Sequence, residues 1–337
     1  MKKINKVLII AEIGVNHNGK LSLAKKLIKK AVEAGADVAK FQIFKAEKLV
    51  TQNLRKANYQ IKSNIKKNTQ FEMLKKLQLK PKDFLAIAKF CKKLKIEFCA
   101  SCFDTDSLKI LKKIKVKRIK IPSGEITNYI LLKNIARLKK EIIMSTGMST
   151  LVEIKNAIKV LTKYGARLKD ITLLQCNSEY PTPYADANLL AIKELKKKFK
   201  TQVGYSDHTS GIEASIGAVA LGASIIEKHL TLNKLKTGPD HQASIEVDEY
   251  KKLVKSIRNI EICLGESKKK VTKSENKNKN IVRKIIVASK NILKGEKFSL
   301  KNIEPKRAGK GISAMLINQV IGKKANKNYS FDEIIKL

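Results

Sequence analysis

The feature that most constrains the fold of this 337-residue chain is a series of short β-branched, apolar runs, each followed by a segment with helical periodicity. Such runs predict strands buried on both faces, and the intervening helices predict that consecutive strands are parallel. The expected strands lie at residues 7–14, 38–44, 97–103, 118–124, 141–147, 171–177, 201–207 and 224–230. That number of strand–helix units in about 265 residues suits an α/β fold of the TIM (β/α)8 barrel type. A doubly wound open sheet is the alternative, but no G-x-G-x-x-G follows the first strand.

Two helix starts carry the spacing of a capping box, Thr150 with Glu153 and Ser210 with Glu213. After Gly265 the pattern changes, because residues 266–280 are rich in Lys, Asn, Ser and Glu and have almost nothing to bury. We expect a barrel domain over 1–265, a linker over 266–280 and a small accessory domain over 281–337, with short β-like runs such as Ile285 to Ala288.

Polar residues recur at the ends of the expected strands. A charge inside a parallel strand that is buried on both faces costs several kcal/mol unless a partner, metal or ligand compensates it. Every expected strand except the third, which offers only Ser101, carries such residues near its C-terminal end, the catalytic face of TIM barrels. They are Glu12, Lys40, Gln42, Lys120, Ser123, Ser145, Asn177, Ser178, Ser206, His208, Glu227 and His229.

Two of these residue groups indicate particular ligands. His208 and His229 end neighbouring strands, so their imidazoles can converge on one divalent cation, with water or substrate oxygens in the other positions. Such an open site suits Mn²⁺ or Mg²⁺ better than a closed structural zinc, and would act as a Lewis acid on a carbonyl. Lys40 and Lys120, together with the serines, suit a small ligand that carries both phosphate and carboxylate. The expected ligand is therefore a phosphorylated acid.

The composition argues against other classes of protein. The formal net charge is +41, but only seven of the 71 basic residues are Arg and there is no single basic tract, which does not favour nucleic acid as a partner. The longest uncharged apolar stretches, such as residues 218–226, are too short to cross a membrane. Five cysteines, an odd number, suit a reducing compartment, so we expect a cytoplasmic protein.

A set of motifs along the whole chain resembles the N-acetylneuraminate (sialic acid) synthase family, which includes legionaminic and pseudaminic acid synthases. In order they are AEIGVNHNG, KFQIFKAEKL, IKIPSGEITN, IIMSTGMST, NSEYPTPY, VGYSDHTSGIEA, EKHLTL, TGPDHQAS and KRAGKGIS. The resemblance implies a TIM barrel followed by an antifreeze-like (SAF) domain. It also implies condensation of phosphoenolpyruvate with N-acetylmannosamine, or a related acetamido sugar, to a nine-carbon 2-keto acid and phosphate. The alternative substrate is a 2,4-diacetamido-trideoxy hexose, as for legionaminic or pseudaminic acid.

The same resemblance assigns expected roles to residues of this chain. His208 and His229 match the family's Mn²⁺ ligands, and Glu12, Glu227 and His229 are the expected catalytic residues. Phosphoenolpyruvate is expected to contact Lys40, Lys120, Ser123, Ser145 and Ser206. Ser178 falls where some members have asparagine, and its neighbour Asn177 is included with it as a candidate contact. The sugar and the reacting centre are expected to contact Glu12, Gln42, Tyr180, Glu227 and Asp240. Arg307 resembles an arginine that reaches the partner subunit's barrel, which implies a homodimer with a swapped C-terminal domain.

Two departures from the family pattern stand out. The chain reads ASCFD at 100–104 where relatives commonly read STPFD, and Ala308 replaces a usual proline beside Arg307. One other reaction also remains open from the residues alone. A barrel aldolase that forms a Schiff base on Lys40 or Lys120 would need one of these lysines to have a lowered pKa.

Overall fold

The computed structural model describes residues 6–56 and 69–337. The chain forms two compact units, one that ends at Gly265 and one from Glu266 to Leu337. Among the described residues, every helix is too short or too polar to span a lipid bilayer.

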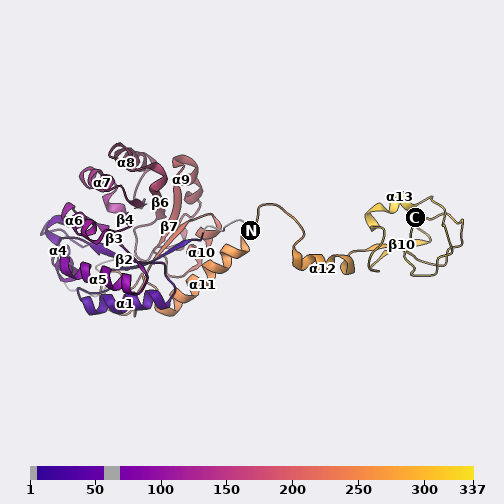
Figure 1. Ribbon diagram of the computed structural model, residues 1–337, viewed down its shortest axis with the longest axis horizontal. Coiled ribbons are helices and arrows are strands. Elements are labelled where there is room, and N and C mark those ends of the chain that lie inside the picture. The colour runs from indigo at the N-terminus through magenta and orange to yellow at the C-terminus, as the bar shows by residue number, and fades with distance from the viewer. Residues whose placement is uncertain (1–5, 57–68) are drawn as a thin grey trace. The chain divides into compact units, whose positions relative to one another are not determined.

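The first unit is a closed barrel in which parallel strands follow one another in sequence order, surrounded by helices (Figure 1). The strands are β1 (Leu8–Gly14), β2 (Val38–Ile43), β3 (Glu97–Cys102), β4 (Arg118–Ile121), β5 (Glu141–Ser145), β6 (Ile171–Cys176), β7 (Gln202–Asp207) and β8 (Ile225–His229). The barrel closes where β1 pairs with β8, from Leu8 opposite Ile225 to Glu12 opposite His229. The predicted TIM barrel is therefore confirmed.

Each predicted strand corresponds to an observed one, but several predicted ranges extend beyond the C-terminal end of the observed strand. The largest difference is at β4, which was expected to continue to Gly124 but ends at Ile121. Pro122 has no N–H to donate to a strand ladder, and a 3-10 turn over Ser123–Glu125 follows it. The shortened strand leaves Ser123 in a loop at the mouth of the barrel.

Helices cover the strands of the barrel (Figure 1). Their bounds are α1 (Leu21–Glu33), α2 (Ala46–Leu49), α4 (Gln70–Leu77), α5 (Pro81–Lys93), α6 (Thr105–Ile114), α7 (Tyr129–Ala136), α8 (Leu151–Lys163), α9 (Ala191–Phe199), α10 (Glu213–Ala220) and α11 (Val247–Cys263). The capping box predicted at Thr150 and Glu153 is present at the start of α8. The one predicted at Ser210 and Glu213 is wrong, because α10 begins at Glu213, whose carboxylate accepts the N–H of Ile212 instead.

The second unit contains α12 (Lys273–Val282), the antiparallel pair β9 (Ile285–Ala288) and β10 (Ile303–Lys306), and the short helix α13 (Ile317–Val320). Its own small core includes Ile286, Phe298 and Tyr329. The segment predicted as a linker, 266–280, contains most of α12, which starts with a capping box of Thr272 and Glu275 and buries none of its residues. Local capping therefore favours a helix in a segment whose side chains are not buried.

A fully buried ion pair joins β7 to β8 directly beside the two histidines. The Lys228 Nζ lies 3.0 Å from the Asp207 Oδ2, and both side chains are 0% exposed. Asp207 also accepts hydrogen bonds from the Thr209 N–H and the Ser215 hydroxyl, while Lys228 donates to the Thr209 carbonyl. His208 directly follows Asp207 in the sequence, and His229 directly follows Lys228. Because side chains alternate along a strand, the histidines point away from the face that carries the ion pair. The ion pair therefore holds the ends of both strands in register.

We predict that Lys228→Met lowers the free energy of unfolding by about 3–5 kcal/mol, because it leaves the Asp207 carboxylate buried without a counter-charge. The double variant Asp207→Asn with Lys228→Met is expected to lose less, since neither charge remains. Denaturant unfolding measures the free energy of unfolding of the single and the double variant. The exposed Lys236→Met is the matched control, and a Lys228→Met protein as stable as that control would contradict the assignment.

Candidate active site

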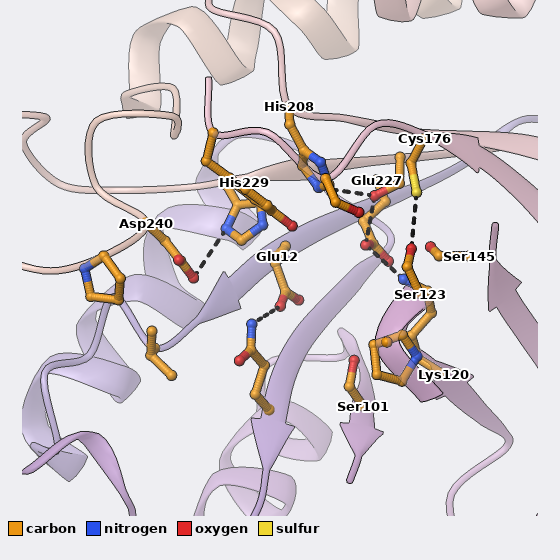
Figure 2. Close-up of a pocket in the computed structure, with 18 of the residues that line it drawn as sticks. Glu12, Ser101, Lys120, Ser123, Ser145, Cys176, His208, Glu227, His229 and Asp240 are labelled. Atoms are coloured by element: carbon orange, nitrogen blue, oxygen red, sulfur yellow. Dashed lines mark hydrogen bonds and ion pairs between the residues drawn. The ribbon is translucent and has the colours of Figure 1, made fainter. Parts of the chain in front are cut away.

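The C-terminal ends of the barrel strands enclose a cavity of about 680 Å³. Its lining collects most of the residues that were predicted from the sequence, and Figure 2 shows them converging from several strands. The predicted residues in the lining are Glu12, Lys40, Gln42, Lys120, Ser123, Ser145, Ser178, Tyr180, Ser206, His208, Glu227, His229 and Asp240. Strand-end positions far apart in the sequence therefore share one site.

Two buried lysine–glutamate pairs lie in this cavity. The Lys40 Nζ lies 2.7 Å from the Glu12 Oε2, and the Lys120 Nζ lies 3.0 Å from the Glu227 Oε1. Lys40 also approaches the Glu227 Oε1 at 3.6 Å, so the pairs form one network. All four side chains are at most 4% exposed. Burial of these charges is tolerated because each ammonium group faces a carboxylate.

The two carboxylates differ in their affinity for protons. Burial raises the pKa of Glu12 above its usual range, and the neighbouring Lys40 only partly opposes this. Burial also acts to raise the pKa of Glu227, but Lys120 and Lys40 outweigh it and hold that pKa below its usual range. Glu227 additionally accepts a hydrogen bond from the Ser206 hydroxyl at 3.0 Å. The site thus offers one carboxylate that remains ionised and one that can take up a proton more readily.

His208 and His229 lie side by side, with their ring centroids 5.5 Å apart and Tyr180 stacked on His208 at 4.1 Å. Burial lowers the pKa of His208 to about 4 and the pKa of His229 well below its usual value, so both imidazoles are neutral near pH 7. The His208 Nδ1 lies 2.5 Å from the Asn177 carbonyl oxygen. If Nδ1 donates this hydrogen bond, the lone pair of Nε2 is left for another partner.

This donor set fits a divalent cation. A neutral imidazole is the form that binds metals, and a metal-bound histidine commonly donates its other ring N–H to a carbonyl, as His208 can to Asn177. The buried Nδ1 of His229 has no hydrogen-bond partner and lies 3.7 Å from the Asp240 Oδ2. Within residues 6–56 and 69–337, no three His, Cys, Asp or Glu side chains form a cluster that could hold a metal. Protein ligation would therefore leave coordination positions open.

Serine hydroxyls gather on the opposite side of the cavity, next to Gly147. A Cβ at position 147 would collide with the Ser178 and Ser123 hydroxyls, so only glycine allows this close approach. The Gly147 N–H donates to the Ser123 Oγ at 3.1 Å, and the buried Ser145 Oγ has no hydrogen-bond partner. This cluster of hydroxyls beside Lys120 can surround the oxygens of an anionic group.

Two predicted residues are not part of the lining. The Asn177 side chain accepts the N–H of Glu179, and only its backbone carbonyl reaches His208. Arg307 belongs to the second unit, where its side chain is exposed. The third strand also contributes, since Ser101 lines the cavity and its hydroxyl accepts a hydrogen bond from Lys40 at 3.1 Å.

Apolar residues that the sequence analysis did not predict also line the cavity. They include Val15, Met73, Leu74, Leu77 and Phe103. Three of them come from α4, whose apolar stripe looks like that of any helix packed on a core. The sequence therefore carries no signal that this helix faces a ligand cavity.

The chain is similar to known proteins over nearly its full length. It is 51% identical to the N,N'-diacetyllegionaminic acid synthase of Campylobacter jejuni, covering 99% of this chain and 100% of that protein. The synthase of the same name from Legionella pneumophila is 44% identical, and the match covers 96% of this chain and 91% of that protein. Among solved structures, N-acetylneuraminic acid (sialic acid) synthetase from Leptospira borgpetersenii, in complex with citrate, is 36% identical with a TM-score of 0.72, covering 82% and 90%.

Family models agree with this result. The SAF domain model matches residues 283–337 in the second unit. The NeuB family model matches residues 27–269, and together with these relatives it shows that the chain belongs to the NeuB family.

Proposed function

We propose that this chain condenses phosphoenolpyruvate with an acetamido sugar to form a nine-carbon 2-keto acid and phosphate. The observation that carries the proposal is the placement of two ammonium groups and a serine cluster next to a pair of neutral imidazoles in one cavity. One side suits an anion and the other suits a carbonyl group whose oxygen gains negative charge. The names and identities of the relatives support the same reaction class.

On the anionic side, Lys40 and Lys120 provide positive charge for the phosphate and carboxylate of phosphoenolpyruvate. Ser123, Ser145 and Ser206 supply hydroxyls to the remaining oxygens. Ser145 is suited to this role because its buried Oγ has no partner within the protein. The ligand would then satisfy a group that is otherwise costly to bury.

On the sugar side, His208 and His229 would hold a divalent cation, for which we propose Mn²⁺ with Mg²⁺ as the alternative. Such a cation supplies Lewis-acid stabilisation of the negative charge on the aldehyde oxygen. The bond that forms joins C3 of phosphoenolpyruvate to the aldehyde carbon, with the electron pair of the C2–C3 double bond. Water then adds at C2. One of its protons ends on the aldehyde oxygen, which becomes a hydroxyl, and the other leaves with the phosphate. The bond from C2 to the phosphate oxygen breaks, so that C2 becomes the keto carbon and phosphate is released.

Of the two carboxylates, Glu12 is the better acceptor for a proton from the water. Burial raises the pKa of Glu12, whereas Lys120 and Lys40 hold the pKa of Glu227 below its usual range, so Glu12 binds a proton more tightly. Glu227 instead stays ionised and orients Lys120 and the Ser206 hydroxyl. The structure thus supports different roles for the two residues in the proposed reaction.

For the sugar we favour a 2,4-diacetamido-trideoxy hexose over N-acetylmannosamine, the first expectation from the sequence. The relatives named for N,N'-diacetyllegionaminic acid share 51% and 44% of their residues with this chain. The synthetase named for N-acetylneuraminic acid shares 36%. The core of the cavity would serve both sugars, because the reacting atoms are the same.

A Schiff-base aldolase is not favoured by the site. Burial alone would lower the pKa of Lys40, but Glu12 and Glu227 outweigh it and raise that pKa above its usual value. A lysine that attacks a carbonyl must first lose its proton. Lys120 is also paired with a carboxylate, at 3.0 Å.

We predict that incubation with phosphoenolpyruvate, Mn²⁺ and the diacetamido sugar gives phosphate and a product with the mass of the condensed 2-keto acid. N-acetylmannosamine in a parallel reaction is expected to be used with a lower kcat/KM. Mass spectrometry and phosphate release measure the outcome, with omission of the sugar as the control. A protein that releases no phosphate with either sugar would contradict the proposed reaction.

His229→Ala is expected to weaken Mn²⁺ binding by about a hundredfold or more while the protein remains folded, since it removes one of two protein ligands. Titration calorimetry measures the affinity and circular dichroism checks the fold. His241→Gln is the matched control, because His241 does not line the cavity. Unchanged Mn²⁺ affinity in His229→Ala would rule out this ligand assignment.

We also propose a homodimer in which Arg307 of each chain serves the barrel of the other. An exposed arginine outside the barrel unit is available for such a role. Its planar, always charged guanidinium can hydrogen-bond to the oxygen of an acetamido group.

Mixing two inactive variants tests this arrangement. Arg307→Ala and His229→Ala are each expected to have low activity alone. After subunit exchange, a mixed dimer contains one barrel with both histidines that is served by an intact Arg307, so activity returns. If Arg307 acts within its own chain, mixing restores nothing, and the swapped arrangement is wrong.

A further inference from the structure

The cavity is chemically divided, and one part of it has no role in the proposed reaction. Figure 2 shows Asp240 on one side of His229 and Glu12, and Ser123 and Ser145 on the other. Another part of the lining, next to the end of β1, is apolar. Val15, Met73 and Leu77 form a small buried cluster there, against which the half-buried Leu74 and Phe103 pack while also lining the cavity. We call these five residues the apolar wall.

The apolar wall adjoins the polar groups expected to meet the sugar. A Cβ at Gly14 would lie 3.1 Å from Glu12 Oε1 and 3.2 Å from both Asp240 Oδ2 and Gln42 Nε2, so these three side chains converge there. Val15, the next residue, begins the wall. A sugar whose aldehyde carbon lay near the histidines, and whose polar atoms met Gln42 and Asp240, would have its far end next to the wall.

The wall is a firmly positioned part of the fold. A Cβ at Gly19 would collide with the Lys76 carbonyl, so the end of α4 packs directly on the loop after β1. The Gln78 side chain accepts the N–H of Ala46 at 2.9 Å, which fixes α4 to the start of α2. The start of α4 is fixed by a capping box of Thr69 and Glu72. The apolar side chains are thus held in place before any ligand binds, which favours selective binding.

The wall also differs from the rest of the cavity in lacking charge. The lysines of α4, Lys75 and Lys76, are exposed and do not line the cavity. A hydroxyl or charged group placed against Leu74 and Phe103 would lose its water without gaining a hydrogen bond from them. A methyl group placed there would instead be removed from water favourably.

From these contacts we propose that the apolar wall is the subsite that selects a sugar with a methyl-bearing C4–C6 end. Its occupants are the acetyl methyl of a C4 acetamido group and the C6 methyl of a 6-deoxy sugar. This inference rests on the proposed function, and it identifies residues that discriminate between acetamido sugars. N-acetylmannosamine carries hydroxyl groups at both positions and gains nothing from the wall.

The test compares two sugars in one set of variants. Leu74→Gln introduces a polar group into the wall at a half-buried position, and Leu74→Ala removes apolar contact without adding polarity. Both are expected to lower kcat/KM for the 2,4-diacetamido-trideoxy hexose by about tenfold or more, a typical effect of losing methylene contacts in an apolar pocket. The kcat/KM for N-acetylmannosamine and the KM for phosphoenolpyruvate are expected to change by less than about threefold.

Lys76→Gln is the matched control, because this exposed side chain is on the same helix and does not line the cavity. Thermal melting checks that each variant is folded. If Leu74→Gln does not fold, the comparison of the two sugars is made with Leu74→Ala alone. Equal losses for both sugars, or an unchanged ratio of kcat/KM values, would overturn the proposed subsite while leaving the reaction intact. Absence of phosphate release from the unmodified protein with either sugar would instead overturn the reaction itself.

Discussion

The compensation of buried charge at the mouth of the barrel is the constraint on which the site depends. Lys40 and Lys120 lie on strands buried on both faces and are tolerated because Glu12 and Glu227 face them at 2.7 and 3.0 Å. No single strand could hold such a charge alone. The closed barrel, in which β1 pairs with both β2 and β8, brings the compensating charges together.

A third buried pair, Lys228 with Asp207, lies next to this network in sequence but has a different role. Its atoms are satisfied by each other and by Thr209 and Ser215, with no exposed surface. The neighbouring Ser206, His208, Glu227 and His229 all line the cavity. Alternation along β7 and β8 thus separates a structural network from the residues available to ligands.

The cavity combines a hydroxyl-rich side, a pair of imidazoles and an apolar wall. In the proposed condensation of phosphoenolpyruvate with a sugar aldehyde, the two imidazoles would be needed whichever sugar is used. The wall comes from the loop after β1, the helix α4 and the residue after β3, all outside the barrel strands. Loops and short helices at this face can change without disturbing the barrel, because the strands carry the core.

The amino-acid sequence by itself determined the barrel, the unit that follows it and nearly all of the polar lining. Strand-end charges such as Lys40 and Glu227 are conspicuous because a buried strand rarely contains them. The sequence did not show that α10 starts without a serine cap, that the Asn177 side chain turns towards Glu179, or that α4 faces the cavity. Only the tertiary structure decided these points, because a hydroxyl, an amide or a leucine has several acceptable partners. Which partner it meets depends on chain segments brought together by folding.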